Sequence, residues 1–114
     1  MNLKEVVIGG GIGAVEIAMA MAFSLKNSAV REYKITIIDK SNGLNGIRPQ
    51  TRKALLLALD SFSIKTLNHA EVLEVTETEV RTKTYPAIAS NFTVVAAGAS
   101  PYLYARQIGR ASCV

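Results

Sequence analysis

Apolar residues are grouped along the chain in short runs and longer stretches. The short run Glu5–Ile8 stops at consecutive glycines and is typical of a strand that is buried on both faces. The longer stretch Ile12–Lys26 is rich in Ala, Met, Ile and Leu and contains no Gly or Pro after Gly13, so it predicts a helix. Because this helix is apolar on nearly every side up to Ser24, we expect more than one neighbouring element to cover it.

A second strand–helix pair follows the first. The β-branched run Tyr33–Asp39 predicts a strand, and the helix before it predicts a right-handed parallel crossover from the first strand. Ser41–Arg48 contains glycines and asparagines and predicts a loop. Pro49 then stands where a helix can begin without losing a hydrogen bond, and Gln50–Leu59 carries a helical pattern of apolar residues.

The remaining apolar runs are short and predict strands. Ser63–Leu67 is a third strand, and Ala70–Thr76 with Val80–Thr84 forms a hairpin where a crossover helix would otherwise lie. Asn91–Ala97 predicts a buried strand that ends at Gly98. The order of elements predicts an α/β domain with a mainly parallel central sheet and a β-hairpin excursion.

Length and composition narrow the possible classes of protein. The chain has 114 residues, of which 49% are hydrophobic and 19% charged, as expected for a single globular domain spanning residues 1–114. The formal net charge of +4 is spread along the chain without a basic run among aromatic residues, so we expect no nucleic-acid partner. The longest apolar run, Ile17–Phe23, is far shorter than the roughly 20 residues that span a bilayer, so we expect no transmembrane segment.

Cysteine and histidine are too rare for a disulfide framework or a metal centre. The one cysteine, Cys113, excludes an internal disulfide, suits a reducing compartment, and leads us to expect a cytoplasmic protein. The one histidine, His69, has no second histidine or cysteine near it in the sequence. We therefore expect no metal site.

The glycines between the first predicted strand and helix carry the most specific chemistry. Gly9 lets the chain turn out of the strand, and Gly11 leaves the backbone bare where a pyrophosphate must approach. The small Ala14 lets the helix pack close to the strand, and the helix N-terminus directs its unpaired N–H groups at the phosphate. A tight turn needs fewer than three consecutive glycines. We therefore expect the turn to bind a dinucleotide through Gly9, Gly10, Gly11, Ile12, Gly13 and Ala14.

Asp39 ends the second predicted strand, at the edge where the glycine turn also lies. A carboxylate there can accept hydrogen bonds from ribose hydroxyls and would repel a 2′-phosphate, which favours NADH over NADPH. The neighbouring cations Lys40 and Arg48 act in the opposite direction, and Lys40 is close enough in sequence to reach the nucleotide. A solvent-exposed acid at a strand end is the alternative interpretation of Asp39.

Three blocks of sequence resemble one known family. They are Gly-Gly-Gly-Ile-Gly-Ala-Val-Glu at 9–16, Ile-Thr-Ile-Ile-Asp-Lys at 35–40, and Thr-Val-Val-Ala-Ala-Gly-Ala-Ser-Pro at 93–101. In this order they resemble the NAD(P)H-binding domain of pyridine nucleotide-disulfide oxidoreductase-type flavoproteins, a group that includes type II NADH dehydrogenases and sulfide:quinone reductases. Two departures are Ala14 in place of the third glycine and an acid, Asp39, 25 residues past Ala14 where about 20 is usual.

The resemblance implies a Rossmann-type domain inserted between two FAD-binding segments, neither of which is found in this chain. The chain would then be a fragment of an enzyme that transfers hydride from NADH to FAD, and would be catalytically incomplete alone. The pair Val15–Glu16 implies a nicotinamide-nucleotide domain, with Glu16 as the catalytic residue near the nicotinamide and the flavin. The resemblance also implies that Ala97 and Gly98 bring the backbone close to the nucleotide, although simple close packing is the alternative.

Other interpretations of the same residues remain open. Glu16 is the only charge between Glu5 and Lys26, so on a covered helix it would need a partner, or it would interact with the helix dipole. FAD binds to a similar glycine turn and acid, so the chain could be an FAD-binding half. A non-enzymatic domain that senses NADH or mediates an interaction is the third possibility.

Overall fold

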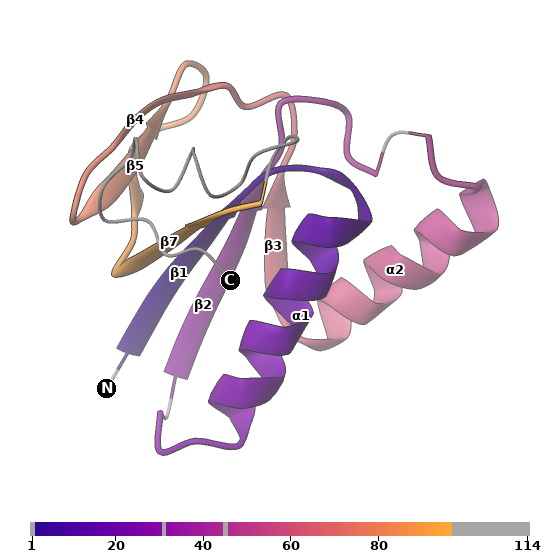
Figure 1. Cartoon of the computed structure of the whole chain (residues 1–114), viewed down its shortest axis with the longest axis horizontal. Coiled ribbons are helices and arrows are strands. Elements are labelled where there is room, and N and C mark those ends of the chain that lie inside the picture. Colours follow the sequence, from indigo (N-terminus) through magenta and orange to yellow (C-terminus); the bar gives the residue numbers. More distant parts are fainter. Residues whose placement is uncertain (1, 31, 45, 97–114) are drawn as a thin grey trace.

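The computed structural model describes residues 2–30, 32–44 and 46–96 (Figure 1). Strands and helices alternate in the first part of the chain, and strands alone follow. In order the elements are β1 (Asn2–Ile8), α1 (Gly11–Lys26), β2 (Glu32–Ile38), α2 (Pro49–Ser61), β3 (Ile64–Leu67), β4 (Val72–Val75), β5 (Glu79–Thr82), β6 (Ile88–Ala89) and β7 (Phe92–Val95).

Four of the strands form a parallel sheet in the order β3–β2–β1–β7. β1 is central, and its last residue Ile8 is in register with Ile38 of β2 and Val95 of β7. β-branched residues fill these strands and are buried on both faces, as expected for a parallel sheet covered on two sides.

The sheet lies between two different layers (Figure 1). Val7 of β1 faces the helices, where it packs in a core with Ala14 and Ala18 of α1 and Leu59 of α2. The preceding residue, Val6, points the other way and packs with Val80 of β5 in a second core. A separate antiparallel sheet of order β4–β5–β6 forms this opposite layer. The predicted α/β class with a mainly parallel central sheet is confirmed.

The excursion between β3 and β7 is larger than the predicted hairpin. β4 and β5 pair as predicted, but β6 adds a third antiparallel strand through Val80 and Ile88. β6 was missed because it has only two residues and follows Pro86 directly, so it lacks the length and alternation that identify a strand in sequence.

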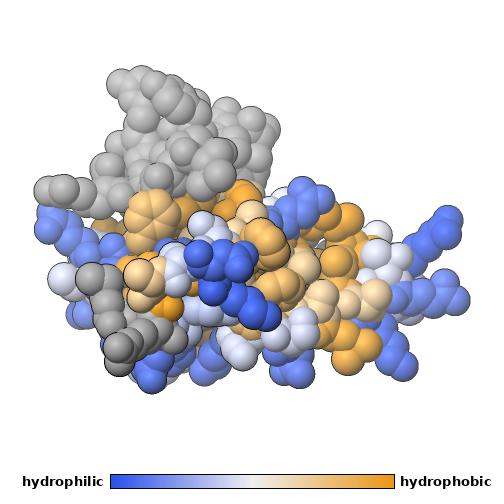
Figure 2. Space-filling model, turned by 90° about the horizontal axis from the view of Figure 1, so that it is seen from below, coloured by the Kyte–Doolittle hydropathy of each residue, from blue (hydrophilic) through white to orange (hydrophobic). Residues whose placement is uncertain are grey.

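More than one neighbouring element covers α1, as predicted, since α1 packs against β1, β2 and α2. Its buried residues, Ala14, Val15, Ala18 and Ala22, lie on one stripe, while Phe23 is 63% exposed. Apolar side chains therefore reach the surface between charged ones, as Figure 2 shows for the face seen from below. Neither helix in the described ranges is long and apolar enough to cross a membrane.

Candidate functional site

The carboxyl ends of the four parallel strands meet at one edge of the molecule. Backbone hydrogen bonds hold these ends together: Gly9 N–H donates to Ile38 O (2.9 Å), Asp39 N–H to Leu67 O (2.9 Å) and Ala96 N–H to Ile8 O (2.8 Å). The chain leaves β1 toward β2 on one side, whereas β7 pairs on the other side of β1. Such a switch in strand order opens a crevice at the carboxyl edge, where open α/β sheets bind ligands.

The glycine turn between β1 and α1 depends on conformations that favour glycine. Gly9 has φ +143° and Gly11 has φ +78°, both in the region that L-residues avoid. A Cβ built on Gly11 would meet no atom within 4 Å, so the space in front of it is open. The backbone of Gly11 is thus bare on the side that faces away from the protein.

No side chain at the N-cap of α1 accepts a hydrogen bond from the backbone N–H groups of the first turn. The helix begins at Gly11, one residue earlier than predicted, with Gly10 as a cap that makes no side-chain hydrogen bond and with no acid in the first turn. Its leading N–H groups carry the partial positive charge of the helix dipole. This end of α1 therefore suits an anionic group.

Asp39 lies directly against the glycine turn. Its carboxylate is buried, with 6% of the residue exposed, and Oδ1 accepts hydrogen bonds from the Ser41 N–H and the Ser41 hydroxyl, both at 2.9 Å. A Cβ on Gly10 would lie 2.6 Å from Asp39 Oδ2, which is too close for any real contact. Gly10 is therefore required by the approach of Asp39, since its own φ of −119° is ordinary.

A small hollow of about 70 Å³ connects Asp39 and the glycine turn with the start of α2. We call it the Asp39 hollow. Besides Gly10, Gly11 and Asp39, its polar lining is Asn42, Gly43, Arg52, Thr66 and Asn68.

Arg52 and the two asparagines were not identified from the sequence. Arg52 Nη2 donates to Asn42 O at 3.3 Å, which ties α2 to the loop after β2. Asn68 follows β3, and its amide lies so close to Gly43 that a Cβ there would be 2.8 Å from Asn68 Oδ1. The useful signal was present for Asn68, which follows a predicted strand at the same carboxyl edge, but no local pattern singles out Arg52.

The other residues of the turn and its neighbourhood occupy distinct positions. Ala14 is 1% exposed and packs beside Val7, so the helix approaches the sheet closely at this small side chain. Ile12 is 45% exposed and Gly13 also faces open space, so both border the solvent near the helix start. Lys40 is exposed and, like Arg48, does not line the Asp39 hollow.

Glu16 does not join the Asp39 hollow. It lies in the second turn of α1, is exposed, and borders an apolar hollow of about 390 Å³ formed by α1 with Glu5 and Phe92. The expectation that Glu16 needs a partner because its helix is covered is therefore wrong, since water reaches its carboxylate. Ala97 and Gly98, predicted to end the last strand, lie outside the described residues.

Buried in the wall of the same apolar hollow is a carboxylate without a hydrogen-bond partner. Glu5 on β1 is 8% exposed, and its Oε2 forms no hydrogen bond in the described structure. Burial among apolar neighbours raises the pKa of Glu5 above its ordinary value, because desolvation disfavours the charged form. The strand that begins at Glu5 was predicted to be buried on both faces, but a buried carboxylate without a hydrogen-bond partner was not predicted.

No family model matches the sequence, and no curated protein sequence matches it. Solved structures do match. NDH2 from Plasmodium falciparum in complex with NADH superposes with a TM-score of 0.73 at 17% identity, over 84% of this chain and 22% of that chain. A ferredoxin reductase from Rhodopseudomonas palustris gives 0.71 at 16% identity, over 94% of this chain and 27% of that chain.

A third match is an engineered water-forming NADPH oxidase bound to NADPH, with a TM-score of 0.68 at 15% identity, over 83% of this chain and 21% of that chain. The chain thus spans about a fifth to a quarter of the length of these three structures. All three are oxidoreductases by name. At such identities the likeness is one of fold, and this chain has a Rossmann-like fold that it shares with a domain-sized part of these three structures.

Proposed function

We propose that the chain is the NADH-binding domain of a flavin-dependent oxidoreductase. The observation that carries the proposal is the arrangement at the carboxyl edge. Gly11 has open space before it at the uncapped start of α1, and the Asp39 carboxylate lies against Gly10. A pyrophosphate and an adenosine ribose, joined as in a dinucleotide, need these two groups side by side.

Each end of the nucleotide would use different chemistry. The pyrophosphate would accept hydrogen bonds from the N–H groups of the first turn of α1, with Gly9, Gly10, Gly11, Ile12, Gly13 and Ala14 shaping the approach. Ribose hydroxyls would donate to Asp39 Oδ2, since Oδ1 already accepts two hydrogen bonds from Ser41. A 2′-phosphate at the same place would meet a buried negative charge, which favours NADH over NADPH.

Arg52 and Lys40 are the cations that bear on this preference. Arg52 lines the Asp39 hollow and donates to Asn42 O, so its guanidinium is held by the loop near Asp39. We propose that it contacts the adenosine end of the nucleotide without reversing the preference set by Asp39. Lys40 is exposed and would act only by its long-range charge.

The flavin would come from outside the described residues. The resemblance of three sequence blocks to flavoprotein reductases and the names of the structural neighbours support this step. NADH would supply hydride, FAD would accept it, and this chain would hold the nucleotide in place. Glu16, on the exposed side of α1 near the start of the helix, is available to the nicotinamide end and the flavin, as the family resemblance implies. Ala97 and Gly98 remain proposed backbone contacts to the nucleotide.

Titration of the purified chain with NADH, NADPH and FAD tests the proposal. We expect saturable binding of NADH, weaker binding of NADPH, and little binding of FAD, measured by calorimetry. Binding of FAD without a response to NADH would instead identify an FAD-binding half. A folded sample that ignores all three compounds at millimolar concentration would contradict nucleotide binding altogether.

A further inference from the structure

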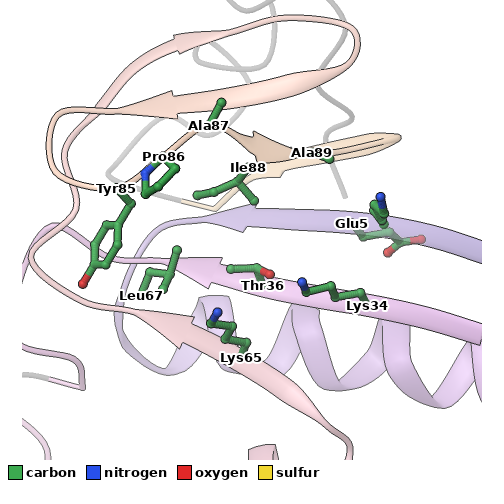
Figure 3. A pocket seen from close by; sticks show the side chains of 11 residues that line it. Glu5, Lys34, Thr36, Lys65, Leu67, Tyr85, Pro86, Ala87, Ile88 and Ala89 are labelled. Carbon is green, nitrogen blue, oxygen red and sulfur yellow. The ribbon is translucent and has the colours of Figure 1, made fainter.

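A second cavity lies on the opposite face of the parallel sheet, away from the Asp39 hollow. It measures about 260 Å³ and lies between β1, β2 and β3 on one side and the segment 85–89 on the other (Figure 3). We call it the lysine cleft. The sheet contributes Lys4, Lys34, Thr36, Lys65 and Leu67 to its lining.

The three lysines share one face because of strand alternation. Lys4 lies two residues before Val6, whose side chain is in the core beneath the antiparallel sheet. Lys34 lies four residues before Ile38 on β2, and Ile38 belongs to the same core. Lys65 lies two residues before Leu67 on β3, which packs against that core. Lys4 and Lys34 are directly opposite each other in the register of β1 and β2.

These lysines place uncompensated positive charge at the cleft. The ion pairs of the antiparallel sheet join Arg81 to Glu74 and Glu79, and neither Lys34 nor Lys65 forms an ion pair with any residue of the described ranges. Like charges directly opposite each other on neighbouring strands destabilise a sheet. Glu5 also borders the cleft, but it is adjacent to Lys4 on β1, so alternation directs its carboxylate toward α1.

The side chains converge on the space beneath segment 85–89. In Figure 3 the side chains of Lys34 and Lys65 extend along the sheet, and the Thr36 hydroxyl lies between their amino groups in this view. Thr36 is itself buried, with 3% of the residue exposed. Pro86, Ala87 and Ile88 form an apolar wall above these polar groups.

We propose that the lysine cleft binds a small metabolite that carries a phosphate monoester. Ammonium groups are hydrogen-bond donors without acceptors, and with a hydroxyl they match the oxygens of a phosphate. The cleft volume of about 260 Å³ is sufficient for a short phosphate ester. The apolar wall receives the body of the ligand. This site is independent of the nucleotide site at the carboxyl edge.

Glycerol 3-phosphate is a suitable probe. Glycerol and inorganic phosphate are the controls, because each represents one part of the probe. Binding would be followed by backbone NMR shifts at constant ionic strength in the whole chain. We expect saturable shifts centred on Thr36, Lys65 and Ile88, weaker binding of inorganic phosphate, and none of glycerol.

Two double variants separate a site from diffuse attraction. Lys34→Ala/Lys65→Ala should weaken binding of glycerol 3-phosphate by about tenfold or more, the loss of at least one charge-assisted hydrogen bond. Lys26→Ala/Lys53→Ala removes the same charge from exposed positions on the helices and should leave the affinity unchanged. NADH binding should be unaffected in both double variants.

Three outcomes would overturn the proposal. The first is the absence of binding at millimolar concentration. The second is an equal weakening in the two double variants, which would indicate only the net charge of the chain. The third is a set of shifts centred on Gly11, which would show that the phosphate goes to the glycine turn.

Discussion

Gly10 and Gly11 are neighbours in the glycine turn and are glycines for different physical reasons. Gly11 adopts φ +78° with open space before it, whereas Gly10 has an ordinary φ and no room for a Cβ beside Asp39. Gly13 has open space and lies inside α1, so neither reason applies to it. Substitutions at these positions therefore give separable results.

Replacing Gly11 by Leu should abolish NADH binding, because the side chain enters the space proposed for the pyrophosphate. The positive φ adds a loss of stability of about 1–2 kcal/mol. Gly46→Leu is the matched control, since Gly46 has φ +83°, open space around it and no part in the Asp39 hollow. Calorimetric titration and thermal unfolding should show similar destabilisation but loss of binding only at Gly11; equal affinities would contradict the proposed pyrophosphate site.

Gly10→Ala should weaken NADH binding by displacing the Asp39 carboxylate, which would otherwise lie 2.6 Å from the new Cβ. It should also destabilise the fold, because Asp39 and its hydrogen bonds to Ser41 must shift. Gly13→Ala should instead stabilise the fold by about 0.5–1 kcal/mol, because alanine has a higher helix propensity than glycine. Denaturant unfolding of both variants measures the two changes in the free energy of unfolding. An unchanged free energy in Gly10→Ala would show that Asp39 can move without loss of stability.

Asp39→Asn should reduce the proposed preference for NADH over NADPH, because it removes the charge that would repel a 2′-phosphate. The amide oxygen can still accept the two hydrogen bonds from Ser41, so the loop after β2 should keep its shape. Asp60→Asn removes the same charge from an exposed position on α2 and serves as the control. The ratio of the two dissociation constants is the measurement; an unchanged ratio in Asp39→Asn would rule out the ribose assignment.

At the scale of elements, β1 and α1 form the proposed binding site at one end and bury a carboxylate, at a cost in stability, nearer the other end. Their junction forms the glycine turn, while nearer the start of β1 Glu5 faces α1, and its Oε2 has no hydrogen-bond partner among the described residues. Apolar packing around a carboxyl group favours its neutral form. The pH dependence of stability should therefore carry a contribution from Glu5.

Because the pKa of Glu5 is raised in the folded protein, the folded state binds more protons than the unfolded state between the two pKa values. Stability from this group is fully present below the ordinary pKa of a glutamate and falls as pH rises through the raised value. Glu5→Met, of similar length, should remove this slope and stabilise the protein at neutral pH by about 1–3 kcal/mol.

Urea unfolding of the wild type and Glu5→Met from mildly acidic to neutral pH tests this prediction. Glu16→Met is the control, since Glu16 borders the same hollow but is exposed. A stability difference between wild type and Glu5→Met that does not vary with pH would contradict a role for the titration of Glu5.

At the scale of the whole molecule, both faces of the parallel sheet are covered, but the helices on one face expose large apolar side chains. The antiparallel sheet covers the central strands, whereas Phe23 of α1 and Leu57 of α2 are each 63% exposed. The matched structures are several times longer than this chain. These features agree with the proposal that the chain supplies one domain of a larger oxidoreductase.

The chain alone should therefore bind NADH without oxidising it. In a mixture of NADH and ferricyanide, adding the chain should not change the rate at which the absorbance of NADH falls. This should hold with or without added FAD. Rapid NADH oxidation with FAD supplied would contradict the expectation that further segments are needed to hold the flavin.

Local chemistry by itself determined the strands, the helices and the glycine turn of this protein. β-branched runs, consecutive glycines and a proline at a helix start act through neighbouring residues, so β1, α1, β2 and α2 were predicted to within a few residues. Asp39 could be placed at the carboxyl edge for the same reason, because it ends a strand parallel to β1.

Only the tertiary structure decided which distant side chains share a space. Arg52 and Asn68 reach the Asp39 hollow from α2 and from the end of β3, and Lys4, Lys34 and Lys65 share one face because of the strand register. The burial of Glu5 and the exposure of Glu16 also depend on what packs over β1 and α1. Such facts follow from sheet order and layer packing, which no local sequence pattern encodes.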